Sequence, residues 1–547
     1  MTREDRPPRR AAANVAAFGL ALVPAVLCIS FGAFRAPLWL DEILYFYLQD
    51  DFALRAAEIG RPASSLAPYF GNFFFCDLQR LFQGLLGPLG LSVQSHPEAT
   101  LRLLPLAAFL GACAIFYRSF LRQSGRLDAV LGTLAFSSMP LVLHYAFEAR
   151  VYVFTAFLVV LLLSLLPRAD EGVVPGRTVA LAALGLVTAH SHLWTVCLFA
   201  ALAADGALRL ARSRGPTPQA LARLAASLPA LGLIVAEYAF MKFTDPGRPQ
   251  YPPFRPQPLR LTLEELFVSN FSGPLHLQYY VFNQPSGKIL VWAGAFLLVA
   301  IAILAWRHGD RERRRDILTA AAALALCAFL AVTFGFFQHA RYHLPLLAAL
   351  LFAFGPPRGS VPRGLLAGLV LVNLLLLPDN LEEMDRKSDG RRLAAHVARR
   401  FPDRSRVGVV FQNVPTGGYP FPSHSIAADF YMNFLHPNER PVSLYELPEL
   451  NSVNGRRGVY PFFASDPSLL ARTLKSRPEI WRSRLPLLPA NLVLVNPIWG
   501  LEESQIQLAD FLKIVRESPY RRSGSSFMMF GFPHLFMIEL PAAPEGK

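Results

Sequence analysis

Long apolar stretches separated by short polar loops dominate the first two-thirds of the chain. The first stretch runs from Ala11 to Phe34. Ten more follow at about 101–121, 127–146, 151–167, 178–190, 192–210, 219–242, 287–306, 316–337, 342–355 and 362–378. Each is long enough for a helix or a half-helix in a bilayer. The pattern therefore predicts a polytopic α-helical membrane protein with about eleven spans.

The pattern changes from Asp379 onward, where apolar and polar residues mix as in a soluble domain. It predicts helices at Arg391–Arg400, Ser425–Phe434 and Glu503–Glu517, strands at Val407–Phe411 and Asn491–Val495, and a hairpin at Phe527–Leu540 broken around Gly531 and Pro533. Alternating helices and strands favour a small α/β domain. We therefore expect a transmembrane domain at 1–378 and a soluble α/β domain at 379–547.

Charge assigns a side to each loop. The net charge is +14, although only 17% of the residues are charged and 53% are hydrophobic. The basic residues gather in short loops, as the positive-inside rule requires, and no basic face with interleaved aromatics suggests nucleic acid. The loops expected to be cytoplasmic carry Arg122/Arg126, Arg168/Arg177, Arg209/Arg212/Arg214, Arg307/Arg311/Arg313/Arg314/Arg315 and Arg358/Arg363.

An odd number of spans then places the N-terminus in the cytoplasm, and both the first loop (35–100) and the C-terminal domain outside the inner (plasma) membrane. The loop 35–100 is rich in aromatic residues and suits short helices lying at the membrane interface. The least certain span boundary is Ala189-His190-Ser191-His192. If 178–210 were one tilted span, everything downstream would be inverted, against the charge bias.

Several common motifs are absent. The five cysteines are scattered without a CxxC pair, and four of them lie in apolar stretches, which favours small buried hydrophobes over chemistry. No phosphate-binding GxxxxGK[ST] motif is present, and no GxGxxG has the context of a dinucleotide site. A nucleotide-driven pump and a cytoplasmic nucleotide-sugar enzyme therefore lack support.

The first candidate for chemistry is the acidic pair Asp41 and Glu42, just outside the first span. Neighbouring side chains diverge in a helix or a strand, so the pair is poorly placed to flank one glycosidic bond as a hydrolase requires. One carboxylate acting as a base fits better, in an inverting transfer from a leaving group that needs no protonation, such as phosphate. The alternative is an acidic pair at a helix N-terminus, which the macrodipole favours.

A phosphate leaving group calls for cations on the same side of the membrane. Three candidates are expected there: Arg150, Arg341 and Lys288. An arginine can hold phosphate oxygens in a fork and offset developing negative charge. The alternative for each is a side chain that reaches to the lipid headgroups.

Histidines also gather near the expected external span ends: His144, His190, His192, His339 and His343. With Asp41 or Glu42 they could form a divalent-metal site, but no HExxH or comparable spacing is present. A structural or hydrogen-bonding role is therefore favoured, and no cofactor is assigned.

Five elements together resemble those of the C-type membrane glycosyltransferases, in the branch of protein O-mannosyltransferases and lipid A aminoarabinose transferases. Leu38–Glu42 resembles the family's W-x-D-E element. Glu98–Leu106 is similar to its E-x-x-x-R-L-x element, Tyr145–Tyr152 to its Y-x-x-E-A-R-x-Y loop, His190 to its T-H element, and Arg341–Pro345 to its R-Y-x-x-P element. The ordered set spans about 350 residues. One departure is Val151, where the family often has proline.

The resemblance implies the C-type glycosyltransferase fold and a polyprenyl-phosphate-linked sugar as donor. It implies Asp41 as the essential acid or base beside Glu42, with Arg150 and Arg341 near the lipid phosphate. Further candidate contacts to substrate or metal are Glu148, His190, His339 and Tyr342. The resemblance does not identify the acceptor, because the family's C-terminal domain varies.

The leading hypothesis is an inverting glycosyltransferase that moves a sugar from a polyprenyl phosphate to an extracytoplasmic glycolipid, polysaccharide or protein of the cell envelope. Two alternatives come from other classes. A lipid-linked-sugar flippase would need a charged path through the mid-membrane, which the sequence does not indicate. A non-catalytic assembly or sensor protein would use the C-terminal domain for binding and tolerate loss of Asp41.

Overall fold

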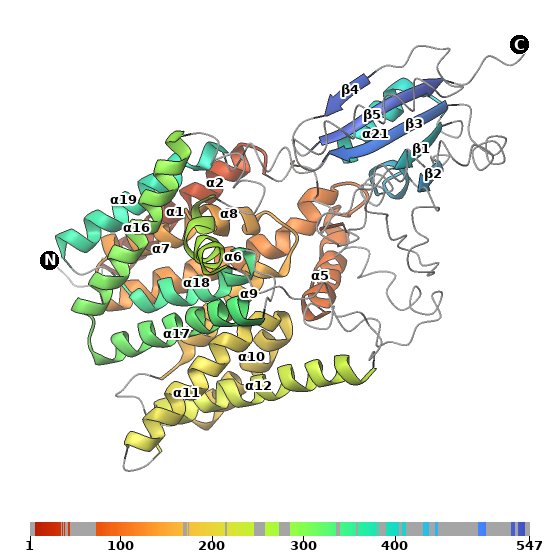
Figure 1. Ribbon diagram of the computed structural model, residues 1–547. Coiled ribbons are helices and arrows are strands. Elements are labelled where there is room, and N and C mark those ends of the chain that lie inside the picture. The colour runs from red at the N-terminus through yellow and green to blue at the C-terminus, as the bar shows by residue number, and fades with distance from the viewer. Residues whose placement is uncertain are drawn as a thin grey trace, which may run out of the picture. The chain divides into compact units, whose positions relative to one another are not determined.

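The structure is a computed structural model of the chain (Figure 1). It describes residues 6–33, 36, 38, 42–43, 73–167, 172, 174–213, 216–244, 258–272, 285–334, 340–356, 359–379, 381, 390–403, 407–411, 430–436, 443–446, 491–498, 527–530 and 534–541. The chain divides into two compact units. The helical unit comprises Met1–Phe34, Arg61–Leu85 and Leu101–Glu383, and the second unit comprises Arg35–Gly60, Leu86–Thr100 and Met384–Lys547.

Helices coincide with every apolar stretch that the sequence indicated. They are α1 (Arg6–Ala21), α2 (Val23–Ser30), α6 (Pro97–Gln123), α7 (Arg126–Ser137), α8 (Pro140–Ala146), α9 (Val151–Leu165), α10 (Pro175–Ser191), α11 (Val196–Arg212), α12 (Pro218–Thr244), α16 (Pro285–His308), α17 (Arg311–Phe334), α18 (Ala340–Phe354) and α19 (Ser360–Leu375). Shorter elements are α5 (Phe73–Leu86), η3 (Gly87–Leu89), η4 (Leu193–Thr195), α13 (Leu259–Leu263), η5 (Glu264–Val268) and α14 (Ser269–Ser272).

Six of the described helices are long and apolar enough to cross a membrane, and the number is eight if each of two bent pairs forms one span. Two shorter apolar helices, Val151–Leu165 and Arg341–Phe354, add to these. The helical membrane-protein class is thus supported. The count of eleven crossings stays a prediction.

Helix breaks have local causes. The α7–α8 pair bends by 71°. Pro140 begins α8, and Met139 before it is extended, because the residue preceding a proline is disfavoured in helical conformation. At the least certain boundary of the sequence analysis, His192 is extended (φ −162°, ψ 123°) between α10 and η4. The stretch 178–210 is therefore two helices, as predicted.

Close helix packing and buried ion pairs hold the lower part of the helical unit together (Figure 1). At Gly185 on α10, an added Cβ would lie 2.1 Å from the carbonyl oxygen of Ala226 on α12, so the two backbones touch. Asp205 on α11 accepts contacts from Arg209 at 2.8 Å and from Arg223 of α12 at 2.7 Å. Glu312 and Asp316 of α17 complete this network, 2.7 Å from Arg209 and 2.6 Å from Arg223 respectively.

The second unit contains a five-stranded mixed sheet of order β2-β1-β3-β5-β4 (Figure 1). Its strands are β1 (Val407–Phe411), β2 (Ser443–Glu446), β3 (Asn491–Ile498), β4 (Phe527–Phe530) and β5 (His534–Pro541). β1 pairs in parallel with β2 and β3, whereas β5 is antiparallel to β3 and β4. Helix α21 (Gly390–Arg400) and the π-helical turn η7 (Phe430–Phe434) also belong to this unit.

Several secondary-structure predictions for residues 379–547 can be compared with the described elements. The strand at 407–411, the strand beginning at Asn491, the helix at 391–400 and the 527–540 hairpin are confirmed. Of the predicted 425–434 helix, the described part is the turn η7, and the predicted 503–517 helix lies outside the described residues. The domain boundary at 378/379 stays a prediction.

Candidate active site

A bend between α8 and α9 gathers charged side chains in the interior of the helical unit. Glu148 lies in this bend and is 3% exposed. Its Oε2 is 3.1 Å from His144 Nε2 on α8, and its Oε1 is 3.1 Å from Arg150 Nε. The backbone N–H of Arg150 also donates to the Glu148 carbonyl at 2.6 Å. The short turn thus fixes one buried carboxylate between an imidazole and a guanidinium.

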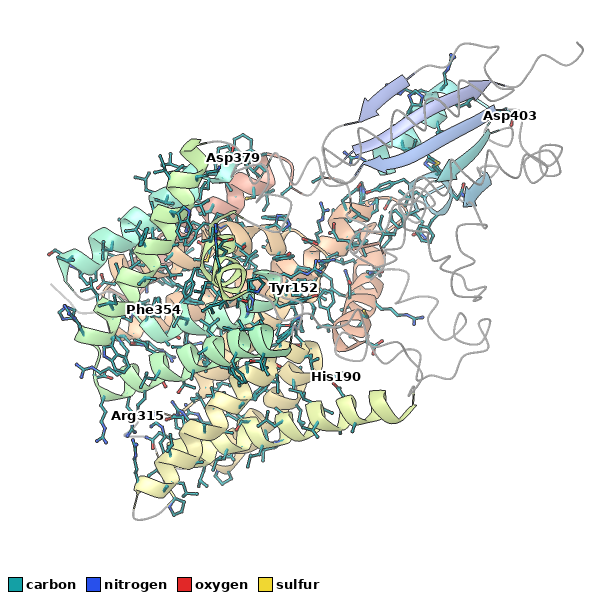
Figure 2. The ribbon with its side chains drawn as sticks, viewed as in Figure 1. Tyr152, His190, Arg315, Phe354, Asp379 and Asp403 are labelled. Carbon is teal, nitrogen blue, oxygen red and sulfur yellow. The ribbon has the colours of Figure 1, made fainter. Side chains whose placement is uncertain are left out.

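Tyr152, in the first turn of α9, lies in the interior of the helical unit (Figure 2) and is close to two arginines. The Arg150 guanidinium lies 5.7 Å from the centre of its ring, and that of Arg341, from the first turn of α18, also lies 5.7 Å from it. Both distances allow a cation–π attraction to the ring. Arg150 and Arg341, 191 positions apart in the sequence, are therefore brought together on one tyrosine.

Aromatic rings and a histidine enclose this pair of cations. Tyr152 contacts Tyr145, His192 and Tyr342 with centroid distances of 5.0, 5.4 and 5.9 Å. His192 lies 5.6 Å from the Tyr342 ring, and Trp194 stacks on the same ring at 6.1 Å. The break at His192 is what turns these side chains toward α18. We refer to Tyr145, Glu148, Arg150, Tyr152, His192, Trp194, Arg341 and Tyr342 as the arginine cage.

The electrostatics of the arginine cage favour an anion. Arg150 is only 3% exposed and pairs with the Glu148 carboxylate, and the positive charge of Arg341 also acts on Arg150. Burial, and after it the charge of Arg341, lowers the pKa of Arg150, which means that the site holds this cation at a cost. Burial and the charge of Arg341 also lower the pKa of His192 to about 3, so that this imidazole is neutral at physiological pH. An anionic ligand would interact favourably with both arginine charges.

The acidic stretch Leu38–Glu42, which contains the predicted catalytic carboxylates, lies in the second unit. Asp41 falls outside the described residues, whereas Glu42 is described and is 1% exposed. Leu38, three positions before Asp41, is fully buried, and its backbone N–H donates to the Tyr431 hydroxyl at 2.6 Å. The stretch that carries the predicted catalytic carboxylates is thus anchored by a residue of the C-terminal region.

The remaining predicted site residues lie elsewhere. His190, in the last turn of α10, pairs through Nδ1 with Glu237 Oε1 of α12 at 2.5 Å and is part-exposed (Figure 2). Lys288 is exposed in the first turn of α16, and among the described residues no contact joins it to the arginine cage. His339 lies outside the described residues. The cage therefore contains Arg150, Arg341, Glu148 and Tyr342 of the predicted set.

Metal binding gains no support from the part of the chain that the structure describes, where no group of three or more His, Cys, Asp or Glu side chains could hold an ion. The histidine and acidic-pair hypothesis included Asp41 and His339, which fall outside that part. All five cysteines are described, and all are buried, as the sequence predicted.

Sequence reasoning missed several members of these sites. It gave no role to Tyr145 or Trp194, and it treated His192 only as one of several external histidines. Tyr431 received no attention, because it lies 393 positions from Leu38. The available signal was the run of aromatic and histidine residues around each helix break, at Tyr145, Tyr152, His192, Trp194 and Tyr342.

Comparison with solved structures gives the fold class: that of the C-type membrane glycosyltransferases. The particular match is ArnT from Cupriavidus metallidurans in the apo state, an aminoarabinose transferase, with a TM-score of 0.54 and 13% identity over 98% of this chain and 100% of that one. ArnT bound to undecaprenyl phosphate gives a TM-score of 0.50 at the same identity and coverage. No protein-family model and no curated protein matches the sequence. The predicted resemblance is confirmed at the level of the fold.

Proposed function

We propose that the protein is an inverting glycosyltransferase that moves a sugar from a polyprenyl-phosphate donor to an extracytoplasmic acceptor at the inner membrane. The observation that carries this proposal is the arginine cage, where two arginines lie against the ring of Tyr152 and one of them pairs with Glu148. The full-length likeness to ArnT, one structure of which holds undecaprenyl phosphate, supports a donor of that class.

The chemistry requires a base and an anion site. A hydroxyl or amine of the acceptor attacks the anomeric carbon while the bond from that carbon to the phosphate oxygen breaks, and Asp41 takes the acceptor's proton. The polyprenyl phosphate that leaves gains negative charge. Arg150 and Arg341 offset this charge, as preorganised cations in a water-poor site do most effectively. Glu148 keeps Arg150 in position.

Transfer of radiolabelled sugar from polyprenyl-phosphate donors to membrane acceptors tests this proposal. The wild-type chain is compared with Asp41→Asn and Arg341→Gln at matched expression, and Arg260→Gln serves as a control because Arg260 is 88% exposed and distant in sequence from both sites. We expect Asp41→Asn to abolish transfer, Arg341→Gln to lower kcat by at least about 100-fold, and the control to match the wild type.

Two outcomes would contradict the proposal. Equal transfer by the wild type and Asp41→Asn would remove Asp41 from the mechanism. Absence of transfer from every donor would favour a non-catalytic assembly or sensor protein, and movement of the lipid-linked sugar across the bilayer without transfer would favour a flippase.

A further inference from the structure

Three polar contacts in series connect the C-terminal region to Leu38, at the start of the acidic stretch Leu38–Ile43. The Tyr431 hydroxyl accepts the Leu38 backbone N–H at 2.6 Å and donates to Glu98 Oε1 at 3.1 Å. Arg391 Nη1 lies 3.3 Å from the same Glu98 oxygen. All four residues belong to the second unit, although they come from distant parts of the sequence.

Each member of this chain is held by its own surroundings. Tyr431 is 4% exposed within the turn η7, where Phe430 stacks on Phe434 at 5.3 Å. Arg391 begins α21, which packs against η7. Glu98 lies in the first turn of α6, where the helix dipole favours a carboxylate. The hydroxyl that receives the Leu38 N–H is therefore fixed from two sides.

Leu38 lies three positions before Asp41, the base proposed above. Three residues span at most roughly 10 Å, so a shift of the Leu38 backbone is passed on to the carboxylates that follow. A displacement of about 1 Å in a reacting group can cost two orders of magnitude in rate.

From this geometry we infer that Tyr431, fixed by Glu98 and Arg391, is a positioning residue: it holds the backbone at Leu38, three positions before the proposed base Asp41. The inference rests on the proposed function and gives the C-terminal region a task separate from acceptor choice. It assigns no contact between Tyr431 and the substrate. Loss of the hydroxyl should therefore affect turnover rather than donor binding.

The test removes the hydroxyl alone, with Tyr431→Phe. The matched control is Tyr117→Phe, because the Tyr117 hydroxyl on α6 is buried without a hydrogen-bond partner among the described residues. We expect Tyr431→Phe to lower kcat about tenfold, within the range for one lost hydrogen bond, with the donor KM unchanged. Combining it with Glu98→Gln should lower kcat no further than the more impaired single variant, because both act through Leu38.

A second measurement follows the Leu38 amide directly. Hydrogen exchange of the peptide that contains residues 36–43 should be faster in Tyr431→Phe and unchanged in Tyr117→Phe. This readout is independent of the enzymatic assay and detects the anchor itself.

The outcomes separate the inference from the proposed function. If Asp41→Asn abolishes transfer while Tyr431→Phe keeps wild-type kcat and exchange, the inference is wrong and the proposed function stands. A raised donor KM at unchanged kcat would also overturn it, since that result indicates a binding contact. Absence of transfer by the wild type would overturn both.

Discussion

At the scale of single residues, His192 shows how burial sets a charge state. Its pKa is lowered from 6.5 to about 3, first by burial and then by the charge of Arg341. The folded chain therefore takes up this proton at lower pH than the unfolded chain. The free energy of unfolding therefore decreases as pH falls from 6.5 toward 3, by at most about 1.4 kcal/mol per pH unit for this group.

We therefore predict that His192→Gln reduces the loss of thermal stability between pH 7 and pH 5. The measurement is the melting temperature of the purified protein in detergent at both pH values. His308→Gln is the control, since His308 is exposed at the end of α16. Identical pH dependence in the wild type and His192→Gln would show that His192 does not titrate as its burial requires.

Residues also show what the sequence could and could not predict about the site. The motifs containing Arg150 and Arg341 were visible, because each accompanies a helix break in an apolar stretch. Their meeting on the ring of Tyr152 was not visible, because it depends on how α9 packs against α18. The hydrogen bond from Leu38 to Tyr431 could not be predicted either. An apolar residue and an aromatic residue 393 positions apart give no sign in the sequence that they meet.

At the scale of elements, the contact between α10 and α12 depends on the absence of a side chain at Gly185. An added methyl would lie 2.1 Å from a backbone oxygen of α12, so the helices would have to separate. We predict that Gly185→Ala destabilises the protein by about 1–3 kcal/mol, the usual cost of overpacking. Gly232→Ala on α12 is the control, because nothing lies within 4 Å of its added Cβ.

Thermal melting in detergent compares these two variants. A melting temperature of Gly185→Ala equal to that of Gly232→Ala would mean that the two helices do not touch at this point. Because α10 ends just before His192, we also expect the loosened variant to lose transfer activity.

The ion network of α11, α12 and α17 gives a second prediction at this scale. Asp205 contacts both Arg209 and Arg223, which are 7% and 3% exposed. Asp205→Asn leaves these buried charges less compensated, and we predict a loss of stability of about 3 kcal/mol. Glu264→Gln breaks the pair with the 88%-exposed Arg260 and should change stability by less than about 0.5 kcal/mol. Equal melting temperatures would contradict a stabilising role for the network.

The elements themselves followed from the sequence more closely than the site did. The strand at Val407–Phe411 coincides with its prediction because it is a short apolar run. Strand β3 extends beyond its predicted end to Ile498, through Pro497, because pairing with β5 continues there. Strand β2 (Ser443–Glu446) was not predicted, because the pattern of four residues is too short to distinguish a strand from a loop.

At the scale of the whole molecule, the charges at the ends of α16 predict its orientation in the membrane. Lys288 lies near its start and Arg307 near its end. Nineteen residues of helix rise by roughly 28 Å, close to the thickness of the hydrocarbon core. We therefore predict that these two residues lie on opposite sides of the membrane. The arginine-rich run Arg311–Arg315 that follows Arg307 predicts that the Arg307 side is cytoplasmic.

Cysteine labelling in intact cells tests this orientation. With the five buried native cysteines replaced by alanine, we predict that an impermeant maleimide labels Lys288→Cys from outside and reaches Arg307→Cys only after the membrane is permeabilised. The reverse pattern would place the C-terminal region in the cytoplasm, away from extracytoplasmic acceptors, and would exclude the proposed reaction. Labelling of both positions from outside would mean that α16 does not cross the bilayer.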